Sequence, residues 1–389
     1  MSENKTPAIR FQGFMDEWKQ YKFSELYKKS SEKNDGSIGM DKNITVATMQ
    51  YKEDIKVSTD EYLNTYYTFN VGDIAFEGHQ NKEFRFGRFI ENDIGDGIVS
   101  HIFGVFRPIV DYDLHFWKYA INNEYLMRGI LSRSTKASTM MHDLVTDDFL
   151  NESFYVPCLN EQKKIGSYLN NLDEIIALHQ RKLTKLQLLK KSMLTKMFPK
   201  DGARVPEIRF QGFHGNWEHR KISEMFKITR GYVLPTKYTI DIQDDINKYP
   251  VFSSQTANNG LMGYYKDYLY ENAITWTTDG ANAGTVRYRR GKFYCTNVCG
   301  VLLSDNITAS KMIAEALNQV AKKYVSYVGN PKLMNNVMAD IVISLPQDKE
   351  EQDVISKYFE MIDYLILLHQ RKLSKLQQIK QAMLSKLFV

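Results

Sequence analysis

The chain has 389 residues, of which 25% are charged and 43% hydrophobic, and its formal net charge is +5. This composition is typical of a folded protein of two to three domains and excludes collagen-like, low-complexity and wholly disordered chains. No run of about 18 apolar residues predicts a membrane span, the polar start lacks a signal peptide, and three cysteines predict no disulfide framework, so we expect a cytoplasmic protein that binds no membrane.

An internal repeat is the strongest feature of the sequence. Short sequences near the ends of one half return near the ends of the other, at an offset of 199 residues at the start and 190 at the finish. The repeated sequences are Ile-Arg-Phe-Gln-Gly-Phe at 9–14 and 208–213, Glu-Gln at 161–162 and 351–352, and His-Gln-Arg-Lys-Leu at 179–183 and 369–373. The inserts between them, roughly 19–158 and 218–347, show little similarity. The chain therefore contains two copies of one frame around two dissimilar inserts.

Both inserts have the pattern of mixed α/β domains. Aromatic and β-branched runs broken by Gly, Asn and Asp, such as 66–73 and 284–292, predict short strands and turns. Each insert also contains a helical stretch, near 113–131 and near 309–325, and ends in a short strand before a proline. We expect two separate α/β heads of unlike sequence.

A long helix is predicted after each insert. Apolar residues recur at alternating steps of four and three, which is typical of a coiled coil. The polar exceptions fall at the same places in both copies, at His179 and Lys190 and again at His369 and Lys380. The residues assigned to the seam between the helices are Leu172, Ile176, His179, Leu183, Leu186, Ile362, Ile366, His369, Leu373 and Leu376. The two helices are expected to pair antiparallel about a pseudo-two-fold axis, which is the simplest way to cover both apolar stripes. Two unrelated surface helices are the alternative, and the coincidence of the polar exceptions disfavours it.

Three further apolar residues, Ile175, Leu178 and Leu189, widen the stripe of the first helix, so each helix is expected to bury more than a narrow seam. His179 and His369 could also be metal ligands or catalytic groups. We favour a polar seam residue that fixes the register of the helices or meets a partner chain.

The predicted fold class is α+β, with two mixed α/β recognition domains separated by two long antiparallel coiled-coil helices in an internal repeat. Residues 1–158 would form the N-terminal segment and first head, and 159–199 the first helix. Residues 200–348 would form a linker and the second head, and 349–389 the second helix.

Several motifs of catalytic or cofactor sites are incomplete. Asn-Pro-Lys at 330–332 lacks the second proline and the aromatic residue of the adenine methyltransferase motif, and residues 280–285 lack the lysine of a phosphate-binding loop. Glu77 and His79 lack zincin spacing, and Cys295 and Cys299 have no second ligand pair. No catalytic residue, cofactor or metal is expected in this chain, and an autonomous enzyme is not predicted.

Polar loops around glycines occur in both inserts. Asn, Gln, Ser, Thr and Arg side chains match the hydrogen-bonding edges of bases, while Lys and Arg hold phosphates. One such loop alone would be an ordinary surface loop, but several in both inserts favour DNA recognition. The predicted DNA-binding residues are His79, Gln80, Asn81, Lys82, Arg85, Arg88, Arg133, Lys136, Ser254, Gln255, Asn258, Asn259, Thr277, Thr278, Asn282, Arg287, Tyr288, Arg289, Arg290 and Lys332.

The duplicated frame, with its Phe-Gln-Gly-Phe starts and His-Gln-Arg-Lys-Leu helices, resembles the specificity subunit of a type I restriction-modification enzyme. The second insert adds Tyr-Pro-Val-Phe-Ser-Ser-Gln at 249–255 and Ala-Gly-Thr-Val at 283–286, which resemble a common target recognition domain of that family. The resemblance implies double-stranded DNA with a bipartite site, two methyltransferase subunits bound through the helices, and endonuclease/translocase subunits. S-adenosylmethionine, ATP and Mg would then belong to the partner subunits.

Three alternatives stay open. A monomeric DNA methyltransferase or nuclease is disfavoured by the incomplete motifs. A coiled-coil scaffold that binds proteins without DNA recognition would explain the helices but leave the duplicated polar loops without a role. A specificity subunit of a methylation-only complex would share every feature above.

Overall fold

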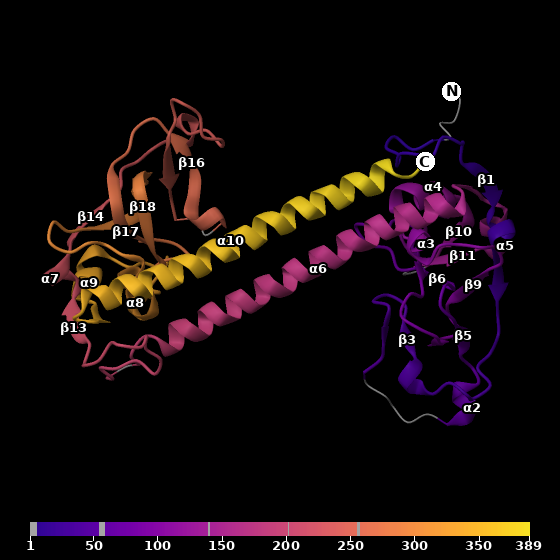
Figure 1. Ribbon diagram of the computed structural model, residues 1–389, viewed down its shortest axis with the longest axis horizontal. Coiled ribbons are helices and arrows are strands. Elements are labelled where there is room, and N and C mark those ends of the chain that lie inside the picture. Colours follow the sequence, from indigo (N-terminus) through magenta and orange to yellow (C-terminus); the bar gives the residue numbers. More distant parts are fainter. Residues whose placement is uncertain (1–5, 54–58, 139–140, 201, 255–256) are drawn as a thin grey trace. The chain divides into compact units, whose positions relative to one another are not determined.

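The computed structural model describes residues 6–53, 59–138, 141–200, 202–254 and 257–389. The chain forms two compact units, which we treat separately: unit 1 is Met1–Gln180 with Arg371–Val389, and unit 2 is Arg181–Gln370 (Figure 1). In the described residues, none of the helices combines the length and the apolar character needed to cross a bilayer.

Unit 1 contains a four-stranded antiparallel sheet in the order β2-β9-β6-β7, four two-stranded pairs, and helices that pack on both sheet edges. Its elements are β1 (Lys19–Lys22), α1 (Phe23–Leu26), β2 (Tyr27–Ser30), β3 (Ile44–Thr45), β4 (Gln50–Tyr51), α2 (Asp60–Leu63), β5 (Tyr67–Phe69), β6 (Ile74–Glu77), β7 (Arg88–Glu91), β8 (Gly97–Val99), β9 (Gly104–Pro108), α3 (Leu114–Ile121), α4 (Glu124–Ser134), β10 (Thr135–Ala137), β11 (His142–Leu144), α5 (Thr146–Asn151), β12 (Ser153–Val156) and the first part of α6 (Leu159–Lys196).

Head 1 is the part of unit 1 that precedes α6, and head 2 is the part of unit 2 between α6 and α10. The core of head 1 is aromatic. Phe149 of α5 is fully buried, and its ring lies 4.4 Å from that of Phe89 and 5.2 Å from that of Phe106, measured between centroids. The helical stretch expected near 113–131 is two helices, because Asp113 caps the Phe116 N–H of α3 and Asn123 caps the Tyr125 N–H of α4. Asn, Asp and Ser at such positions start helices by accepting from unpaired backbone N–H groups.

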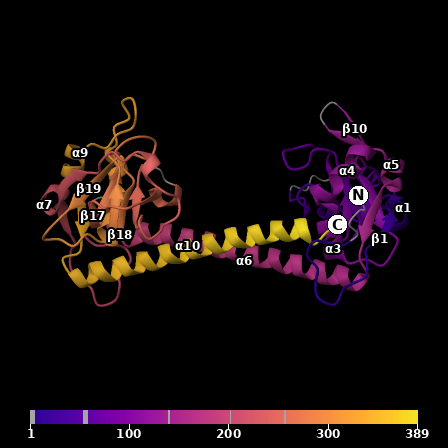
Figure 2. The same ribbon diagram turned by 90° about the horizontal axis from the view of Figure 1, so that it is seen from above.

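Unit 2 is built on a six-stranded sheet in the order β14-β19-β17-β18-β15-β16, in which β15 and β18 run parallel and the other neighbours antiparallel. Its elements are β13 (Glu218–Lys221), α7 (Ile222–Met225), β14 (Lys227–Arg230), β15 (Tyr249–Phe252), β16 (Leu261–Tyr265), β17 (Tyr270–Thr277), β18 (Val286–Cys295), β19 (Cys299–Leu303), α8 (Lys311–Val320), α9 (Asn335–Asp340), β20 (Val342–Leu345) and α10 (Lys349–Lys386), the end of which belongs to unit 1. Strands β17, β18 and β19 lie side by side in Figure 2, and α8 packs on β18.

The repeated ends of the sequence meet in space within each unit. Strand β1 pairs antiparallel with β12 in unit 1, as β13 does with β20 in unit 2. The Arg10 guanidinium donates twice to the Glu161 carboxylate, with both N–O distances 2.7 Å, and Arg209 binds Glu351 with the same two distances. Glu161 and Glu351 are almost fully buried, so this bidentate pair ties the start of each copy to its long helix.

Each long helix ends inside the head of the other copy. Phe388, after α10, is buried with its ring 6.4 Å from that of Trp18, and Phe198, after α6, is buried 6.0 Å from Trp217. The backbone repeats the arrangement. The Ile9 N–H donates to the Lys386 carbonyl, and the Ile208 N–H donates to the Lys196 carbonyl. In each unit the start of one helix therefore packs beside the end of the other, which makes the helices antiparallel.

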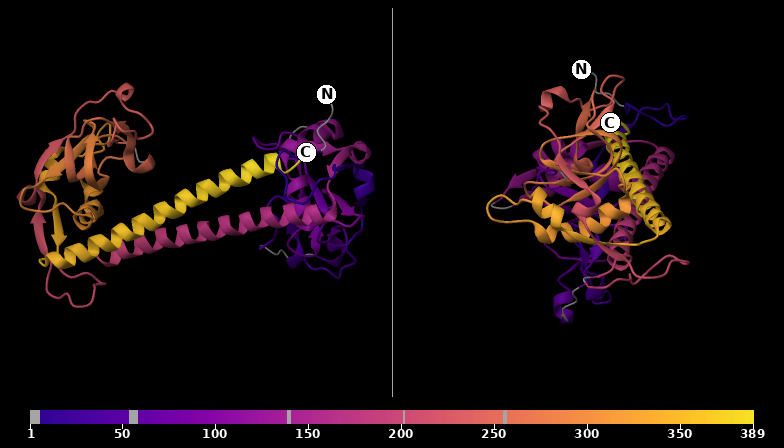
Figure 3. Two further views of the ribbon diagram at one scale, coloured as in Figure 1. Left: turned by 45° about the horizontal axis from the view of Figure 1, so that its top comes forward. Right: turned by 90° about the vertical axis from the view of Figure 1, so that its left-hand side faces the viewer.

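The predicted fold class is confirmed: the chain has two mixed α/β heads, an internal repeat and two antiparallel helices of 38 residues each, drawn as unbroken ribbons in Figure 3. The seam residues are buried (Leu172, Leu183, Ile362) or half-buried (Ile176, His179, Leu186, Ile366, His369, Leu373, Leu376). The expectation of a wider buried stripe is wrong, because Ile175, Leu178 and Leu189 are exposed. Their positions lie beside the 3.5-residue seam, where the facing helix does not cover them.

A charged junction holds each head to both helices. In unit 1 the Asp173 carboxylate of α6 accepts hydrogen bonds from Lys380 of α10 and from the Tyr119 hydroxyl of α3, at 2.8 and 2.6 Å. In unit 2 the Asp363 carboxylate of α10 accepts from Lys190 of α6 at 2.7 Å and from Lys311 of α8 at 2.6 Å.

The two junctions are copies of each other, because Asp173 and Asp363, and likewise Lys190 and Lys380, are related by the 190-residue offset. The polar seam lysine therefore fixes helix register and head attachment at one point. Burial and the neighbouring Asp173 carboxylate both raise the pKa of the Tyr119 hydroxyl. The hydroxyl therefore stays protonated and donates at neutral pH.

Replacing Lys380 with methionine leaves the half-buried Asp173 with only its tyrosine donor. We expect Lys380→Met to lower the free energy of unfolding by about 1–2 kcal/mol, measured by urea denaturation. The matched control is Lys372→Met at an exposed position of the same helix, for which about 0.5 kcal/mol or less is expected. The charge swap Asp173→Lys with Lys380→Asp should recover part of the loss. A swap that is less stable than Lys380→Met would show that the ion pair does not fix the register.

Candidate nucleic-acid interface

A strained turn at 257–260 presents two asparagines on head 2. Asn258 and Asn259 both have left-handed backbone angles, with φ of 48° and 58°, which asparagine adopts more readily than most residues. Both side chains are exposed, and the Asn258 amide has no hydrogen-bond partner among the described residues. Strain of this kind persists only where the surroundings hold it, and it concentrates at functional sites.

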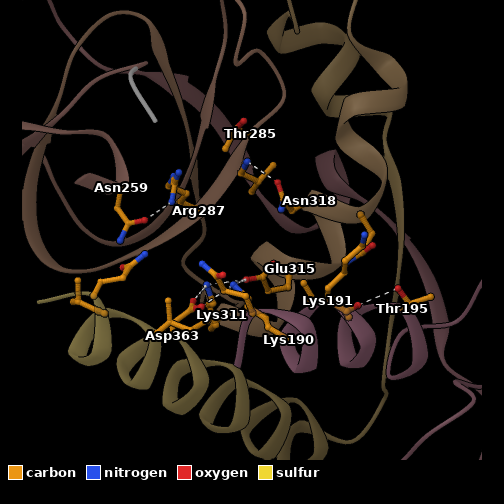
Figure 4. Close-up of a pocket in the computed structure, with 17 residues that line it drawn as sticks. Lys190, Lys191, Thr195, Asn259, Thr285, Arg287, Lys311, Glu315, Asn318 and Asp363 are labelled. Atoms are coloured by element: carbon orange, nitrogen blue, oxygen red, sulfur yellow. Dashed lines mark hydrogen bonds and ion pairs between the residues drawn. The ribbon is translucent and has the colours of Figure 1, made fainter. Parts of the chain in front are cut away.

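Two arginines of β18 hold this turn. The Arg287 guanidinium donates to the Asn259 side-chain oxygen at 2.7 Å (Figure 4), and Arg289 donates to the Asn259 carbonyl at 2.8 Å. Arg289 is only 8% exposed, and its guanidinium lies 3.7 Å from the centre of the Phe252 ring. Burial lowers the pKa of Arg289 to about 9, so the group stays charged at neutral pH. Arg289 therefore anchors the turn from inside the head and does not reach solvent.

Beside the turn lies a polar cavity of about 600 Å³, lined by β18, α8 and parts of both long helices (Figure 4). Lys190 and Lys311 each bind both Glu315 and Asp363, at 2.6 to 3.2 Å, so these four charges neutralise one another. Arg287 and the exposed Lys191 add two further positive charges to the lining. Burial lowers the pKa of Arg287. Arg287 thus belongs both to the wall of this cavity and to the contacts that hold the turn.

The structure brings a second group of predicted residues together in head 2. The Asn282 amide donates to the Ser254 carbonyl at 3.5 Å, and Thr278 donates to the Asp279 carboxylate at 2.6 Å. Lys332 forms a backbone bridge opposite Asp279. These segments, distant in sequence, form one cluster of polar loops.

The predicted residues of head 2 differ in exposure. They are exposed (Asn258, Asn259, Arg290, Lys332), half-buried (Ser254, Asn282, Arg287, Tyr288) or buried (Thr277, Thr278, Arg289). Gln255 lies outside the described residues. Tyr288 and Arg290 alternate along β18 with Arg287 and Arg289, and Arg290 lies 3.9 Å from Glu360 of α10. The four residues of this strand therefore do not share one surface.

In head 1, the loop between β6 and β7 carries His79, Gln80, Asn81 and Lys82, all exposed. Asn81 builds the loop, because its side-chain oxygen accepts from the backbone N–H groups two and three residues ahead. The β10–β11 hairpin packs against this loop, with the His142 N–H donating to the Gly78 carbonyl at 2.8 Å. Lys136 is exposed on that hairpin, and Arg85 is exposed on the β6–β7 loop. The two segments are joined by the edge-to-face contact of Phe86 with His142.

Two predicted arginines of head 1 are occupied by other contacts. Arg88 donates to Glu77 at 2.8 Å and to the Ala47 carbonyl at 3.0 Å, so it ties β6 to β7. Arg133 makes a bidentate pair with Glu152, at 2.7 and 2.6 Å, which raises its pKa. Both guanidinium groups already have acceptors within the chain, which favours structural roles for them.

Sequence reasoning missed a cluster of three histidines. His79, His101 and His142 line one cavity of about 330 Å³ in head 1, and the Nδ1 atom of His142 is buried and has no hydrogen-bond partner in the part of the chain that the structure describes. Spacings of 22 and 41 residues carry no motif that could have revealed the cluster. Throughout the described part of the chain, no three His, Cys, Asp or Glu side chains are arranged to hold a metal ion.

Comparison with known proteins agrees with this architecture. The family model of the type I restriction modification DNA specificity domain matches twice, at residues 15–188 and 214–378. A putative type I specificity subunit N-terminus from Mycoplasma pneumoniae is 41% identical over 137 residues, which are 34% of this chain and 72% of that protein. The specificity subunit of the type I restriction enzyme MpnII from the same species is 34% identical over 148 residues, covering 37% of this chain and 41% of that protein.

A crystal structure of the S subunit of a type I restriction-modification system from M. genitalium has the same fold. It superposes with a TM-score of 0.69 at 17% identity and covers 99% of both chains. Two family matches that together span most of the chain establish the relationship. The chain belongs to the specificity subunits of type I restriction-modification systems.

Proposed function

We propose that the chain reads a bipartite DNA target, one half-site per head, and docks the methyltransferase and endonuclease subunits that carry out catalysis. The observation that carries this proposal is the contrast within the repeat. The clamp of Arg10 and Glu161 returns as Arg209 and Glu351 with the same distances, while the heads differ in sheet, loops and exposed polar groups. An identical frame around unlike heads is the arrangement that two different half-sites require.

The energetics of base reading favour two linked heads. One bidentate contact to a base discriminates by about 1–3 kcal/mol, so a head with a few contacts is a modest reader alone. Linking two heads makes the second engagement intramolecular, which raises specificity without new contacts. Each helix has 38 residues, or about 57 Å at about 1.5 Å per residue. This length exceeds the roughly 34 Å between half-sites one DNA turn apart.

The exposed apolar residues of the helices support docking of partner subunits. On α6 they are Ile175, Leu178, Leu188 and Leu189, and on α10 Met361, Tyr364 and Leu367. Such side chains beside a filled seam are typical of helices that pack against a further protein. We assign them to the methyltransferase subunits. S-adenosylmethionine, ATP and Mg²⁺ are expected in those partners and in the endonuclease, because this sequence lacks the motifs that bind them.

The variant Asn258→Gly tests base reading by head 2. Glycine keeps the left-handed turn but removes the exposed amide. We expect the motif methylated in cells to become degenerate in one half-site only, with discrimination there reduced about 5- to 100-fold. Sequencing of methylated adenines measures this, and Asn336→Gly, on the exposed face of α9, is the control. An unchanged motif would remove Asn258 from the reading surface, and uniform weakening at all sites would indicate a phosphate contact.

A heptad inserted into both helices tests whether they set the spacing of the half-sites. Seven residues near Leu186 and seven near Leu376 preserve the seam pattern and add about 10 Å. The non-specific spacer of the methylated motif should lengthen by about three base pairs, at about 3.4 Å each. An active variant that keeps the original spacer would exclude the helices as the determinant of spacing.

Docking is tested with Leu188→Glu, since this side chain is 67% exposed. The chain should fold with its unfolding free energy changed by about 0.5 kcal/mol or less, because the site is on the surface. Its affinity for the methyltransferase subunit should fall at least about tenfold, measured by co-purification and titration. Gln180→Glu, at an exposed position of the same helix, adds the same single negative charge and is the matched control. Undiminished affinity would place the partner elsewhere.

A further inference from the structure

One loop of head 2, residues 326–332, has a firmly closed base, and of its residues only Lys332 belongs to the predicted DNA-binding set. The Ser326 N–H donates to the Lys332 carbonyl at 2.8 Å, and the Lys332 N–H donates back at 2.9 Å. The flanking residues Val325 and Leu333 are buried, with 8% and 0% of their surface exposed. The five residues between the paired positions therefore project from a rigid support.

This loop is fastened to the polar loops that carry the predicted DNA-binding residues. The Leu333 N–H donates to the Thr278 carbonyl, and the Gly280 N–H donates to the Pro331 carbonyl, both at 2.9 Å. The Trp276 indole, fully buried, donates to the Leu333 carbonyl at 3.1 Å. A ligand that binds the polar loops around Thr278 and Asn282 would therefore also meet the projecting loop, because these segments are joined by hydrogen bonds.

The tip of the loop exposes two adjacent large apolar side chains. Tyr327 is 71% exposed and Val328 is 93% exposed. Gly329 follows with φ of +76°, a backbone conformation that turns the chain sharply and suits glycine. Presenting both side chains to water on a fixed support is typical of an interaction surface.

The charge around the tip selects an anionic partner. Residues 316–339 contain Lys322, Lys323 and Lys332 and no Asp or Glu. All three lysines are exposed, and the Lys332 ammonium lies 3.7 Å from the Asp279 carboxylate. An apolar tip among cations is the chemistry of proteins that insert a side chain between stacked bases while lysines hold the phosphates.

We propose that Tyr327 and Val328 form a wedge that enters the base stack from the minor groove beside the half-site read by head 2, and kinks the DNA there. This proposal rests on the proposed function, because it requires that head 2 binds DNA. The lysines hold the flanking phosphates, and the tyrosine ring stacks on the exposed base face. Head 2 would then select its site partly by how easily the sequence unstacks.

The experiment uses the full chain assembled with its methyltransferase subunits and a duplex that contains the motif found by methylation sequencing. Dyes at the two ends report bending by energy transfer, and 2-aminopurine placed at successive steps reports unstacking. The test variant is Tyr327→Ser with Val328→Ser. The matched control is Tyr232→Ser with Val233→Ser, an exposed Tyr-Val pair elsewhere on head 2.

We expect the wild-type complex and the control to bend the target and raise 2-aminopurine fluorescence at one step. The test variant should lose both signals and bind the target about tenfold more weakly, while its assembly with the methyltransferase is unchanged. If the test variant bends and unstacks the DNA like wild type, or if only assembly is lost, the wedge is refuted and DNA reading by head 2 stands. If the wild-type complex does not prefer its motif, the proposed function itself fails.

Discussion

The structure depends on reciprocal burial: each long helix ends in the core of the head that belongs to the other copy. Phe388 lies against Trp18 and Phe116 in unit 1, and Phe198 lies against Trp217 and Phe359 in unit 2. Burying a phenylalanine contributes about 1.5–3 kcal/mol, so neither head has a complete core without the helix of its counterpart. This constraint makes the helices antiparallel, and it places a charged junction beside each head. Recognition loops can then diverge, because the frame does not depend on them.

The arginines of the chain also divide into those that hold the frame and those that support the surface turn. Arg10, Arg88 and Arg133 each form an ion pair with a carboxylate and hold the fold together. Arg287 and Arg289 have neutral acceptors only, and they hold a strained turn at the surface. A guanidinium that is satisfied by a carboxylate adds little to a reading surface, whereas one that supports a turn positions the exposed amide in front of it. We therefore propose that base recognition in head 2 belongs to the turn and not to the arginines.

The frame could be predicted from sequence, and the interface only in part. Two helices with coincident polar exceptions at Lys190 and Lys380 follow directly from periodicity, because packing repeats every 3.5 residues. Their partners Asp173 and Asp363 lie off the seam and give no such signal. Exposure within the polar loops was also beyond prediction, since burial of Thr277, Thr278 and Arg289 depends on strand order in a six-stranded sheet. The prediction that Ile175, Leu178 and Leu189 are buried was wrong. The sequence pattern shows that these residues are apolar, but it does not show whether another part of the chain covers them.

The central claim is that two unlike heads read two separated half-sites in one DNA molecule. Mapping methylated adenines across the genome of a host with this chain, and of the same host without it, tests the claim most directly. The account predicts a motif of two short, different words separated by a fixed run of unspecified bases, which disappears when the chain is removed. Methylation at a single uninterrupted word, or a motif that persists without the chain, would contradict it.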